Sequence, residues 1–417
     1  RDYYASRGLG DVYKRQKLTI SGNTLTSIGS KAFENAALLA DVYAEPTTAP
    51  AVQADSFSGA GTSVQGSKTF HVASVEAYSS WTTAASGYTM EALGPDYLSE
   101  GLYYRASGED PWKSEIPQTF TTLYVKTAGD NTVMTAEQMK AVADAVKALA
   151  APATVDFSEV VYESETFPNS FKSNANLAGI VFPQNVTKTA SAAFQKTGMT
   201  SVTLLKGISY GSNAFDSCAS LVSVTVEEGV TEIGNYMFQN TKLTDVTLPN
   251  SVTKIGASAF NGCSLTTINF GQGVKTIENS AFQNCGELTE IILPDATETL
   301  GQNAFGDCPK LAKISLGKNM KTLEAYCFVG YSKGCPLLGD IICRATTPPT
   351  LKDDYGTGPF GGGWSPVAGK DVPAENRIIH LPKSADPVGG TGAYADSSWV
   401  KLTSSTYGFA FKYDVEG

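Results

Sequence analysis

Hydrophobic residues recur along the second half of the chain at intervals of 21 to 23 positions. The recurrence is clearest for phenylalanine, which takes the same place in successive units: Phe171, Phe194, Phe215, Phe238, Phe260, Phe282, Phe305 and Phe328. The apolar positions behind each phenylalanine keep a fixed order, which after Phe215 is Leu221, Val224, Val226, Val230 and Ile233. Self-similarity at a fixed spacing predicts a repeat architecture.

Each unit contains one stretch in which apolar and polar residues alternate. Leu243, Val246 and Leu248 illustrate the stretch, which predicts a short strand with one buried face. Pro249 ends the strand because proline cannot donate a ladder hydrogen bond. Asn240, like Asn284 and Asp307 in other units, suits a tight turn. One unit cannot bury its apolar face alone, so we expect the units to stack, at about 4.8 Å per strand, into a solenoid with columns of like residues.

The unit Leu243–Phe260, with Cys263 beyond it, reads Leu-Thr-Asp-Val-Thr-Leu-Pro-Asn-Ser-Val-Thr-Lys-Ile-Gly-Ala-Ser-Ala-Phe. This pattern resembles the BspA-like leucine-rich repeat of bacterial surface proteins. The resemblance implies a β-rich fold, a leucine-rich-repeat parallel-β solenoid with 22–23-residue repeats, placed outside the cell or on its surface and active in adhesion. Two units depart from the pattern, because Thr189 and Tyr210 replace the second isoleucine.

A helix is predicted just before the repeats, over residues 136–150. Thr135-Ala-Glu-Gln138 is a capping-box signature, apolar residues follow at helical spacing, and Pro152 ends the segment. A solenoid needs its open ends covered. We therefore interpret 119–170 as an N-terminal cap with this helix, 171–345 as the leucine-rich-repeat solenoid and 346–417 as a terminal cap module.

The start of the closing segment occurs twice in the chain. Residues 338–349 read LGDIICRATTPP and residues 39–50 read LADVYAEPTTAP, and a histidine, a tyrosine and a tryptophan follow each. We therefore interpret 17–93 as the truncated end of an upstream leucine-rich-repeat array with its own terminal module. Residues 94–118 are interpreted as a linker.

Residues 1–16 are not expected to belong to the protein. Asp11–Gln16 can be encoded by GAT GTG TAT AAG AGA CAG, which looks like an adapter used in transposon-based sequencing libraries. We then expect the sequence to be a metagenomic fragment that lacks its true start. The missing signal peptide would therefore not argue against secretion.

Composition narrows the possible functions. Apolar residues make up 42% of the 417 positions, which is enough for a core, and charged residues make up only 17%. The net charge of −10 argues against nucleic acid as a partner, because nucleic-acid binding needs basic patches. No apolar run approaches the roughly 18 residues that span a bilayer, so no membrane insertion is expected within this fragment.

Four cysteines share one template position, and Asn174, Thr197 and Thr241 fill the same position elsewhere; the cysteines are Cys218, Cys263, Cys285 and Cys308. A position that accepts Cys, Thr or Asn is a small inward turn position, which favours buried reduced thiols. The other three cysteines are irregular, and a bond between two of them is possible: Cys327, Cys335 and Cys343. No paired zinc-site spacing occurs, so we expect no metal site.

Other chemical signatures are weak. His71 and His380 occupy matching places and accompany no nucleophile motif, so we interpret them as structural or solvent-facing. Residues 356–361 match G-x-G-x-x-G, but no helix follows to present its N-terminus to phosphate. Asn185 opens a glycosylation sequon that would be idle in a bacterium. We expect no catalytic residue and no cofactor.

The outward strand positions form the candidate binding face, and they are Thr244, Asp245, Thr247, Thr267, Asn269, Glu290, Ile292, Lys313 and Ser315. Together they make a threonine-rich, weakly acidic field. Such a field suits a shallow protein- or glycan-binding surface. A merely solvated sheet is the competing interpretation, since threonine is a good strand former.

These observations favour a non-catalytic protein, secreted or anchored at the cell surface. Its expected role is adhesion to a protein or glycan partner on a host or a neighbouring microbe. The alternative is a structural stalk that spaces other parts of a larger surface protein from the cell. An enzyme is not expected, because no nucleophile, base or metal cluster stands out.

Overall fold

The structure is a computed structural model that describes residues 101–128, 132–330, 332–354, 358–361, 368–388, 392–395, 397–404 and 407–416, together with parts of 17–92. The segment 1–16 and the first linker residues, 94–100, lie outside the described residues. The chain divides into two compact units, each described by itself below. One comprises Arg1–Ile116 and Lys126–Thr132, and the other comprises Pro117–Val125 and Val133–Gly417.

The first unit contains a parallel sheet with strand order β1-β3-β5-β6 and a second sheet of β2 and β4. Its elements are β1 (Lys17–Ile20), β2 (Ser27–Ile28), β3 (Asp41–Ala44), β4 (Ala51–Val52), β5 (Thr69–Val72), the 3-10 helix η2 (Ser79–Thr82), β6 (Thr89–Ala92) and β7 (Gly101–Arg105). The core packs aromatic rings, with Phe70 and Trp81 in edge contact at 5.7 Å between centroids. The indole of Trp81 donates to the Pro50 carbonyl at 2.8 Å.

The second unit opens with β8 (Thr122–Ala128), α1 (Ala136–Ala148) and β9 (Ala153–Glu159). Helix α1 ends two residues before the predicted end at 150. Its capping box is present, since the Thr135 side chain accepts from the Gln138 N–H and the Gln138 side chain accepts from the Thr135 N–H. One face of α1, including Val142 and Val146, is buried. Asn174 of the first coil donates to the Ala143 carbonyl at 2.8 Å, which joins α1 to the stack.

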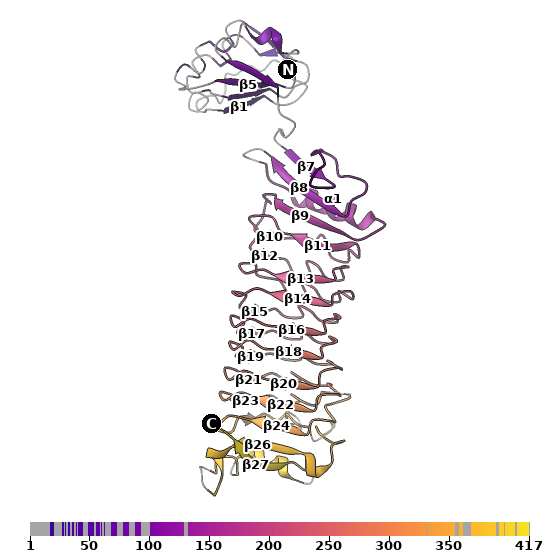
Figure 1. Cartoon of the computed structure of the whole chain (residues 1–417), viewed down its shortest axis with the longest axis vertical. Coiled ribbons are helices and arrows are strands. Elements are labelled where there is room, and N and C mark those ends of the chain that lie inside the picture. The colour runs from indigo at the N-terminus through magenta and orange to yellow at the C-terminus, as the bar shows by residue number, and fades with distance from the viewer. Residues whose placement is uncertain are drawn as a thin grey trace. The chain divides into compact units, whose positions relative to one another are not determined.

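Beyond α1 the chain forms a parallel-β solenoid, as the repeat predicts (Figure 1). Most coils carry one longer strand and one short strand on two different sides; the coil that begins with β13 has only an isolated bridge, at Ser209, in place of the short strand. The long-strand side comprises β11 (Leu177–Val181), β13 (Ser201–Leu204), β14 (Ser223–Val226), β16 (Asp245–Thr247), β18 (Thr267–Asn269), β20 (Glu290–Ile292), β22 (Lys313–Leu316), β24 (Asp340–Cys343), β26 (Ile378–Pro382) and β27 (Ala410–Val415). The short-strand side comprises β10 (Thr166–Phe167), β12 (Lys188–Thr189), β15 (Glu232–Ile233), β17 (Lys254–Ile255), β19 (Thr276–Ile277), β21 (Thr299–Leu300), β23 (Thr322–Leu323) and β25 (Thr350–Leu351).

The core of the solenoid is a stack of the repeat phenylalanines. From Phe194 to Phe305 successive ring centroids lie 5.2 to 5.6 Å apart, with planes within 19° of parallel. The rings are at most 1% exposed. Stacked turns thus bury a continuous column, which no single unit could do alone.

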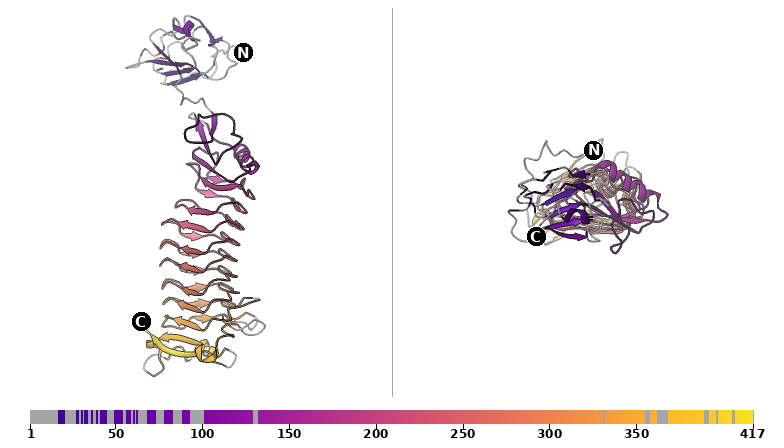
Figure 2. Two further views of the ribbon diagram at one scale, coloured as in Figure 1. Left: turned by 45° about the vertical axis from the view of Figure 1, so that its right-hand side comes forward. Right: turned by 90° about the horizontal axis from the view of Figure 1, so that it is seen from above.

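Tight turns close each coil by using left-handed backbone positions. Asn240, Asn284 and Asp307 have φ of 56°, 61° and 56°, which confirms the turn role expected for them. A second left-handed residue lies two positions before each stacked phenylalanine, as Ser258 does before Phe260. These turns bring the coil back over its predecessor after each short strand (Figure 2).

The C-terminal end of the second unit repeats contacts found in the first. Strands β24, β26 and β27 are sheet neighbours in the same order as β3, β5 and β6. The Trp399 indole donates to the Pro349 carbonyl at 2.8 Å, as Trp81 does to Pro50. This segment also holds the 3-10 helices η3 (Ala374–Asn376), η4 (Lys383–Ala385) and η5 (Ser398–Thr403).

Candidate functional site

The nine residues of the predicted binding face lie on consecutive coils of the long-strand side. Seven of them are exposed, namely Thr244, Asp245, Thr247, Thr267, Asn269, Glu290 and Ile292. Lys313 is half-buried, and its ammonium lies 3.2 Å from a Glu290 carboxylate oxygen. The strand alternation thus places most of the set at the surface and brings it together across neighbouring coils.

Ser315 does not belong to this face, contrary to the sequence prediction, because only 7% of it is exposed. The ladder register places Ser315 between Ile292 of β20 and Ile342 of β24. A small side chain between two larger ones on the same line of a sheet keeps little free surface. Alternation within one strand could not reveal this, because the cover comes from neighbouring coils.

A hollow of about 430 Å³ lies in the predicted face, and we call it the small hollow. It is lined by Thr267, Ile268, Asn269, Phe270, Gln272, Glu290, Ile292, Leu293, Pro294, Asp295 and Arg344. Four of these residues belong to the predicted set. Arg344 was not predicted; its guanidinium donates to the Leu293 carbonyl at 3.0 Å and pairs with Asp295 at 3.1 Å.

The small hollow lies at one of the interruptions in the hydrogen-bonded ladder of the long-strand side; others fall between β11 and β13 and between β14 and β16. Strand β18 pairs with β16, and β20 begins a separate sheet that runs through β22, β24, β26 and β27. Although all residues from 264 to 294 are described, no backbone hydrogen bond joins β18 to β20. In a parallel ladder each strand turns alternate peptide groups toward each neighbour. Groups of β18 and β20 that face this gap therefore have no partner across it.

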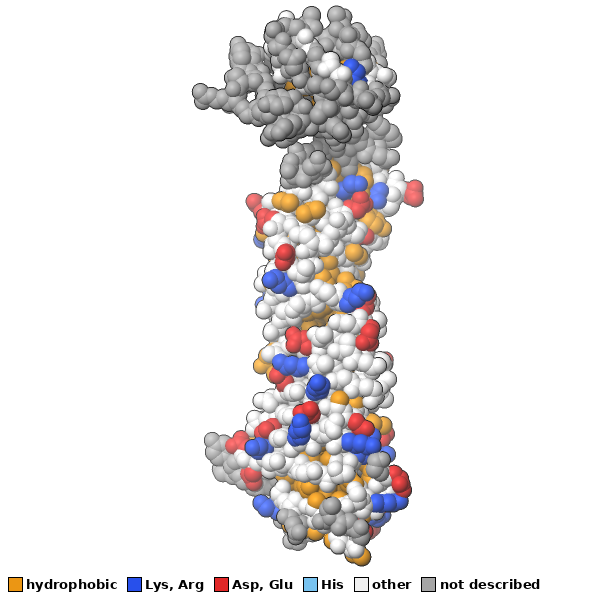
Figure 3. Space-filling model, turned by 90° about the vertical axis from the view of Figure 1, so that its left-hand side faces the viewer, with side chains coloured by type: hydrophobic (Ala, Val, Ile, Leu, Met, Phe, Trp, Pro, Cys, Tyr) orange, Lys and Arg blue, Asp and Glu red, His pale blue; other side chains and the backbone are white. Residues whose placement is uncertain are grey.

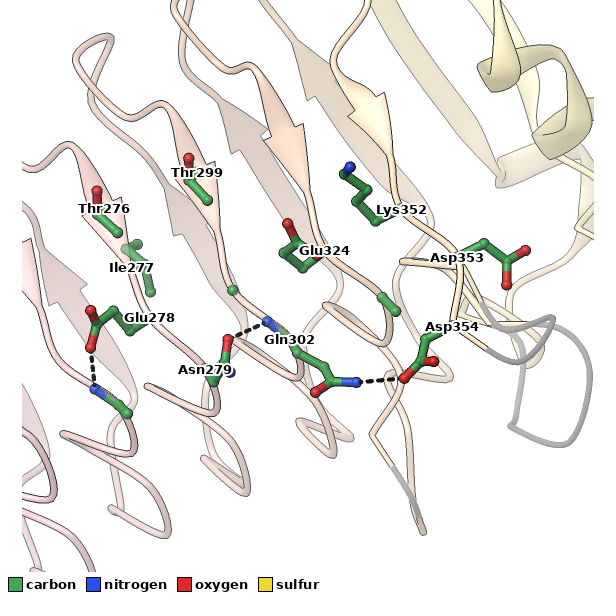
Figure 4. A pocket seen from close by; sticks show the side chains of 13 residues that line it. Thr276, Ile277, Glu278, Asn279, Thr299, Gln302, Glu324, Lys352, Asp353 and Asp354 are labelled. Carbon is green, nitrogen blue, oxygen red and sulfur yellow. Dashed lines mark hydrogen bonds between the residues drawn. The ribbon is translucent and has the colours of Figure 1, made fainter.

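A larger hollow of about 750 Å³ lies on the short-strand side, and we call it the large hollow (Figure 4). It is lined by Ala257, Thr276, Ile277, Glu278, Asn279, Thr299, Gly301, Gln302, Glu324, Ala325, Lys352, Asp353 and Asp354. Its amide side chains form hydrogen bonds between neighbouring coils. The Asn279 side-chain oxygen accepts from the Gln302 backbone N–H at 2.9 Å, and the Gln302 side-chain amide donates to the Asp354 carboxylate at 3.2 Å. Glu278 pairs with Lys254 at 2.9 Å, which raises the pKa of the Lys254 ammonium.

Sequence reasoning missed the large hollow, although the chain carries a signal for it. The position after each short strand holds Gly256, Glu278, Gly301, Glu324 and Lys352 in successive coils. Gly301 therefore leaves a gap between two carboxylate-bearing coils. A side chain could not fill it, because a Cβ at Gly301 would lie 2.6 Å from the Asn279 nitrogen.

Charges along the solenoid are arranged as pairs between neighbouring coils. Lys321 pairs with Glu298 at 2.6 Å, which lowers the pKa of the exposed Glu298 carboxyl. On the face seen in Figure 3, basic and acidic side chains are interspersed among uncharged ones. This pattern provides no extended field of one sign that would attract a strongly charged polymer.

The cysteines of the shared template position are buried, as predicted. The thiol of Cys263 donates to the Phe238 carbonyl of the preceding coil at 3.1 Å. The Thr241 hydroxyl donates to the same carbonyl at 2.9 Å and lies 3.2 Å from the Cys263 sulfur. Burial raises the pKa of the Cys263 thiol to about 11 and that of Cys285 well above its ordinary value. These protonated thiols are poor nucleophiles and serve as an internal polar column.

Cys335 belongs to this column, although its spacing made it look irregular. Its thiol donates to the Phe305 carbonyl at 3.2 Å, as the other column cysteines do one coil earlier. The inserted residues loop out and are held by Asp307, whose Oδ1 accepts the N–H groups of Ser332, Lys333 and Gly334 at 2.6 to 3.0 Å. Spacing alone could not show this, because the insertion in the turn shifts the residue number of the next inward position but not its place in the coil.

His380 and Asn185, which the sequence also singled out, make contacts within the fold. His380 contacts carboxylates on both sides, at 2.8 Å from Asp414 and 3.4 Å from Asp340. The side chain of His71 lies outside the described residues. The Asn185 amide bridges two coils, because it accepts from the Tyr162 N–H at 2.9 Å and donates to the Tyr162 carbonyl at 2.7 Å. Two residues of the glycine motif, Gly356 and Thr357, are also outside the described part.

In the part of the chain that the structure describes, no group of three or more histidine, cysteine or acidic side chains is arranged to hold a metal ion. Nor does any helix there combine the length and apolar character needed to cross a bilayer.

The geometry defines a parallel-β solenoid protein built from leucine-rich repeats. The family model described as "BspA type Leucine rich repeat region" matches residues 155–210 and 208–334 in six copies. Residues 155–334 thus consist of leucine-rich repeats of the BspA type, as the resemblance of the units implies. Among curated proteins, none matches this chain.

The solved structures to which this chain is similar include bacterial proteins. A leucine rich cell surface protein from Faecalibacterium prausnitzii is 18% identical, covering 79% of this chain and 88% of its own, with a TM-score of 0.35. A leucine-rich repeat protein from Eubacterium ventriosum is 17% identical; the match covers 88% of this chain and 92% of that protein, with a TM-score of 0.32. The pneumococcal vaccine antigen PcpA is 18% identical; the match covers 63% of this chain and 79% of PcpA, with a TM-score of 0.33. Because these TM-scores are below 0.5, we take nothing about function from them.

Proposed function

We propose that this chain is a non-catalytic protein of the cell surface or extracellular space that adheres to a protein or glycan partner on a host or neighbouring microbe. One contrast within each coil supports the proposal. Inward positions repeat the same residue types, whereas outward positions differ between coils and line hollows of about 430 and 750 Å³. Repeat solenoids bind partners through such extended surfaces.

A stalk is the second candidate, and one observation favours it. The phenylalanine stack continues past Phe305 to Phe328 and Phe360, with centroid distances of 6.2 and 5.1 Å. A packed column of this length resists bending, because each coil is fixed by both neighbours. A stalk would use this stiffness and would need no binding surface.

Arrays of extracellular proteins and of glycans, probed with the full chain, test the adhesion proposal. Each hit is then measured by biolayer interferometry at several salt concentrations. Adhesion predicts at least one ligand whose affinity falls when an exposed residue of either hollow is changed. A chain that binds nothing on either array would support the stalk.

The domain division is also a proposal. We propose 119–170 as an N-terminal cap, 171–345 as the repeat solenoid and 346–417 as a terminal module. Residues 17–93 would then be a second such module, with 94–118 as a linker. The matching indole hydrogen bonds of Trp81 and Trp399 support this division.

A further inference from the structure

The last three strands of the long-strand side are joined by one histidine as well as by their backbone ladder. Strands β24, β26 and β27 are neighbours in that order at the C-terminal end of the solenoid (Figure 1). His380 lies on the middle strand, and its side chain is 24% exposed. One ring nitrogen faces Asp414 of β27, and the other faces Asp340 of β24. The imidazole therefore spans all three strands.

The two contacts of the imidazole differ in length. Nδ1 lies 2.8 Å from both carboxylate oxygens of Asp414. An ionised carboxylate can only accept, so Nδ1 carries a proton and donates to Asp414. Nε2 lies 3.4 Å from Oδ1 of Asp340, which is longer than a normal N–H···O bond. That oxygen is itself buried and accepts no hydrogen bond, although 44% of the Asp340 side chain is exposed.

Protonation of the ring would supply the missing donor. When Nδ1 donates, a neutral imidazole leaves a lone pair on Nε2, so two acceptors face each other across the 3.4 Å contact. In the imidazolium, Nε2–H can donate to Oδ1 of Asp340, and both hydrogen bonds are charge-assisted. A buried acceptor without a donor is costly, so the protonated ring fits this geometry better than the neutral ring.

The other charged groups around His380 do not replace this donor. Lys412 of β27 is opposite His380 in the strand register, and its charge opposes protonation of the ring. Lys383, which follows β26, pairs with Glu416. On the far side of Asp340, the register places Lys313 of β22, which pairs with Glu290. Two carboxylates in contact with the ring thus outweigh the one lysine opposite it.

The same placement of residue types recurs in the first unit. In the register of β3 and β5, Asp41 stands two places before His71. In the register of β24 and β26, Asp340 likewise stands two places before His380. The third strand of the first unit, β6, pairs Glu91 with His71, so a carboxylate residue follows there too. An aspartate, a histidine and a further acidic residue therefore occupy three adjacent strands in both units.

We propose that His380 is a proton-operated latch that holds β27 to the end of the solenoid. In acid, the imidazolium bonds both Asp340 and Asp414 and ties β24 and β27 to β26. As pH rises, loss of the proton leaves Oδ1 of Asp340 without a donor and weakens the attachment of β27, whose one strand neighbour among the described residues is β26.

The direction of the pH effect follows from the hydrogen bond that only the charged ring can make. The stability that this bond contributes is present in acid and is lost as pH rises through the range in which histidine gives up its proton, about pH 5 to 8. The latch does not depend on the proposed adhesion function, because it would serve an adhesive protein or a stalk equally.

Amide hydrogen exchange of the full chain, followed by mass spectrometry at pH 5 and pH 8, tests the latch. Protection is expressed relative to the unfolded chain at the same pH, which removes the intrinsic effect of pH on the exchange rate. We expect peptides that span β27 to be about three- to fivefold better protected at pH 5 than at pH 8, which is the scale of a half-exposed ion pair. Peptides from β14 to β18 are the internal control, because those coils contain no histidine.

Two variants separate the latch from other effects of pH, and unchanged protection of the control peptides shows that each variant folds. His380→Gln removes the titrating ring, so the ratio for β27 should fall to that of the control peptides. Asp340→Asn provides an amide N–H that can donate to the neutral ring, so protection of β27 at pH 8 should rise towards its value at pH 5. Equal ratios in the wild type and His380→Gln would overturn the latch. A wild-type ratio retained in Asp340→Asn would also overturn it, because the proton would then not act through Asp340.

Discussion

Replacing Phe260 with alanine removes one ring from the middle of the phenylalanine stack. Phe260 is fully buried, and its centroid lies 5.5 Å from that of Phe238 and 5.2 Å from that of Phe282. Both contacts are nearly parallel, at 19° and 8° between planes. The neighbours cannot close the gap easily, because each is held by its own coil and by the next ring.

The expected cost has two parts. Burying a phenylalanine side chain is worth about 1.5–3 kcal/mol relative to leaving it exposed. If about 80 Å³ of cavity persists, the cavity adds about 2 kcal/mol at roughly 24 cal/mol per Å³. Together they give about 3.5 to 5 kcal/mol, which agrees with the roughly 3–5 kcal/mol typical of buried Phe→Ala changes.

Urea unfolding followed by far-UV circular dichroism measures this cost, and hydrogen exchange localises it. We expect faster exchange in the coils of Phe238 and Phe282, because repeat stability depends on nearest neighbours. Thr247→Ala on the exposed face is the control and should change stability by less than about 0.5 kcal/mol. A cost below about 1 kcal/mol for Phe260→Ala, or exchange unchanged in both adjacent coils, would refute the stacked-column reasoning.

Three other predictions follow. The pKa of the Cys263 thiol is near 9 in the unfolded chain and about 11 in the fold, so the stability that the buried thiol contributes is complete below about pH 9 and is lost as pH rises through 11. The free energy of unfolding, measured in urea at pH 8 and pH 11, should therefore fall by about 2 kcal/mol less in Cys263→Thr than in the wild type. An equal pH dependence of both proteins would contradict burial of the thiol. Gly301→Ala should lower the free energy of unfolding by about 1–3 kcal/mol, because its Cβ would lie 2.6 Å from the Asn279 nitrogen. Gly286→Ala should cost much less, because no atom lies within 4 Å of its Cβ position. Equal shifts of the melting temperature in the two variants would argue against close packing of the coils. In limited proteolysis, a protease of broad specificity such as subtilisin should cut first within Arg105–Lys113, where Ser107–Pro111 are exposed, and leave a fragment that starts near Thr119; first cleavage inside the repeats would contradict the proposed linker.

The inward half of each coil could be predicted from the sequence because every inward residue has the same neighbours. Phe260 meets a phenylalanine above and below, so the spacing of one residue type fixes the stack. The turn at Asn284 could also be predicted from the sequence, because asparagine is one of the few residues besides glycine that adopt a left-handed backbone readily. Period and residue type therefore determined the fold class without any knowledge of contacts.

The outward half could be predicted only in part. Alternation places Thr267 and Ile292 at the surface, but it cannot show that Ser315 is covered by the isoleucines of the adjoining coils. Nor can it show the gap between β18 and β20, because both strands have the same alternating pattern as the paired strands. These features depend on how one coil meets the next, which a single unit does not encode.

Arg344 shows how a long side chain from a later coil can shape a surface. It follows β24, yet its guanidinium reaches the Leu293 carbonyl and the Asp295 carboxylate at the small hollow. Its side chain is only 28% exposed, so water screens this ion pair less than it would a fully exposed pair. Replacing the arginine would leave Asp295 without its cation and change the rim of the hollow while the phenylalanine stack stayed intact. The fold and the surface of this solenoid are therefore separable: inward residues hold the coils in place, and outward residues can vary without disturbing them.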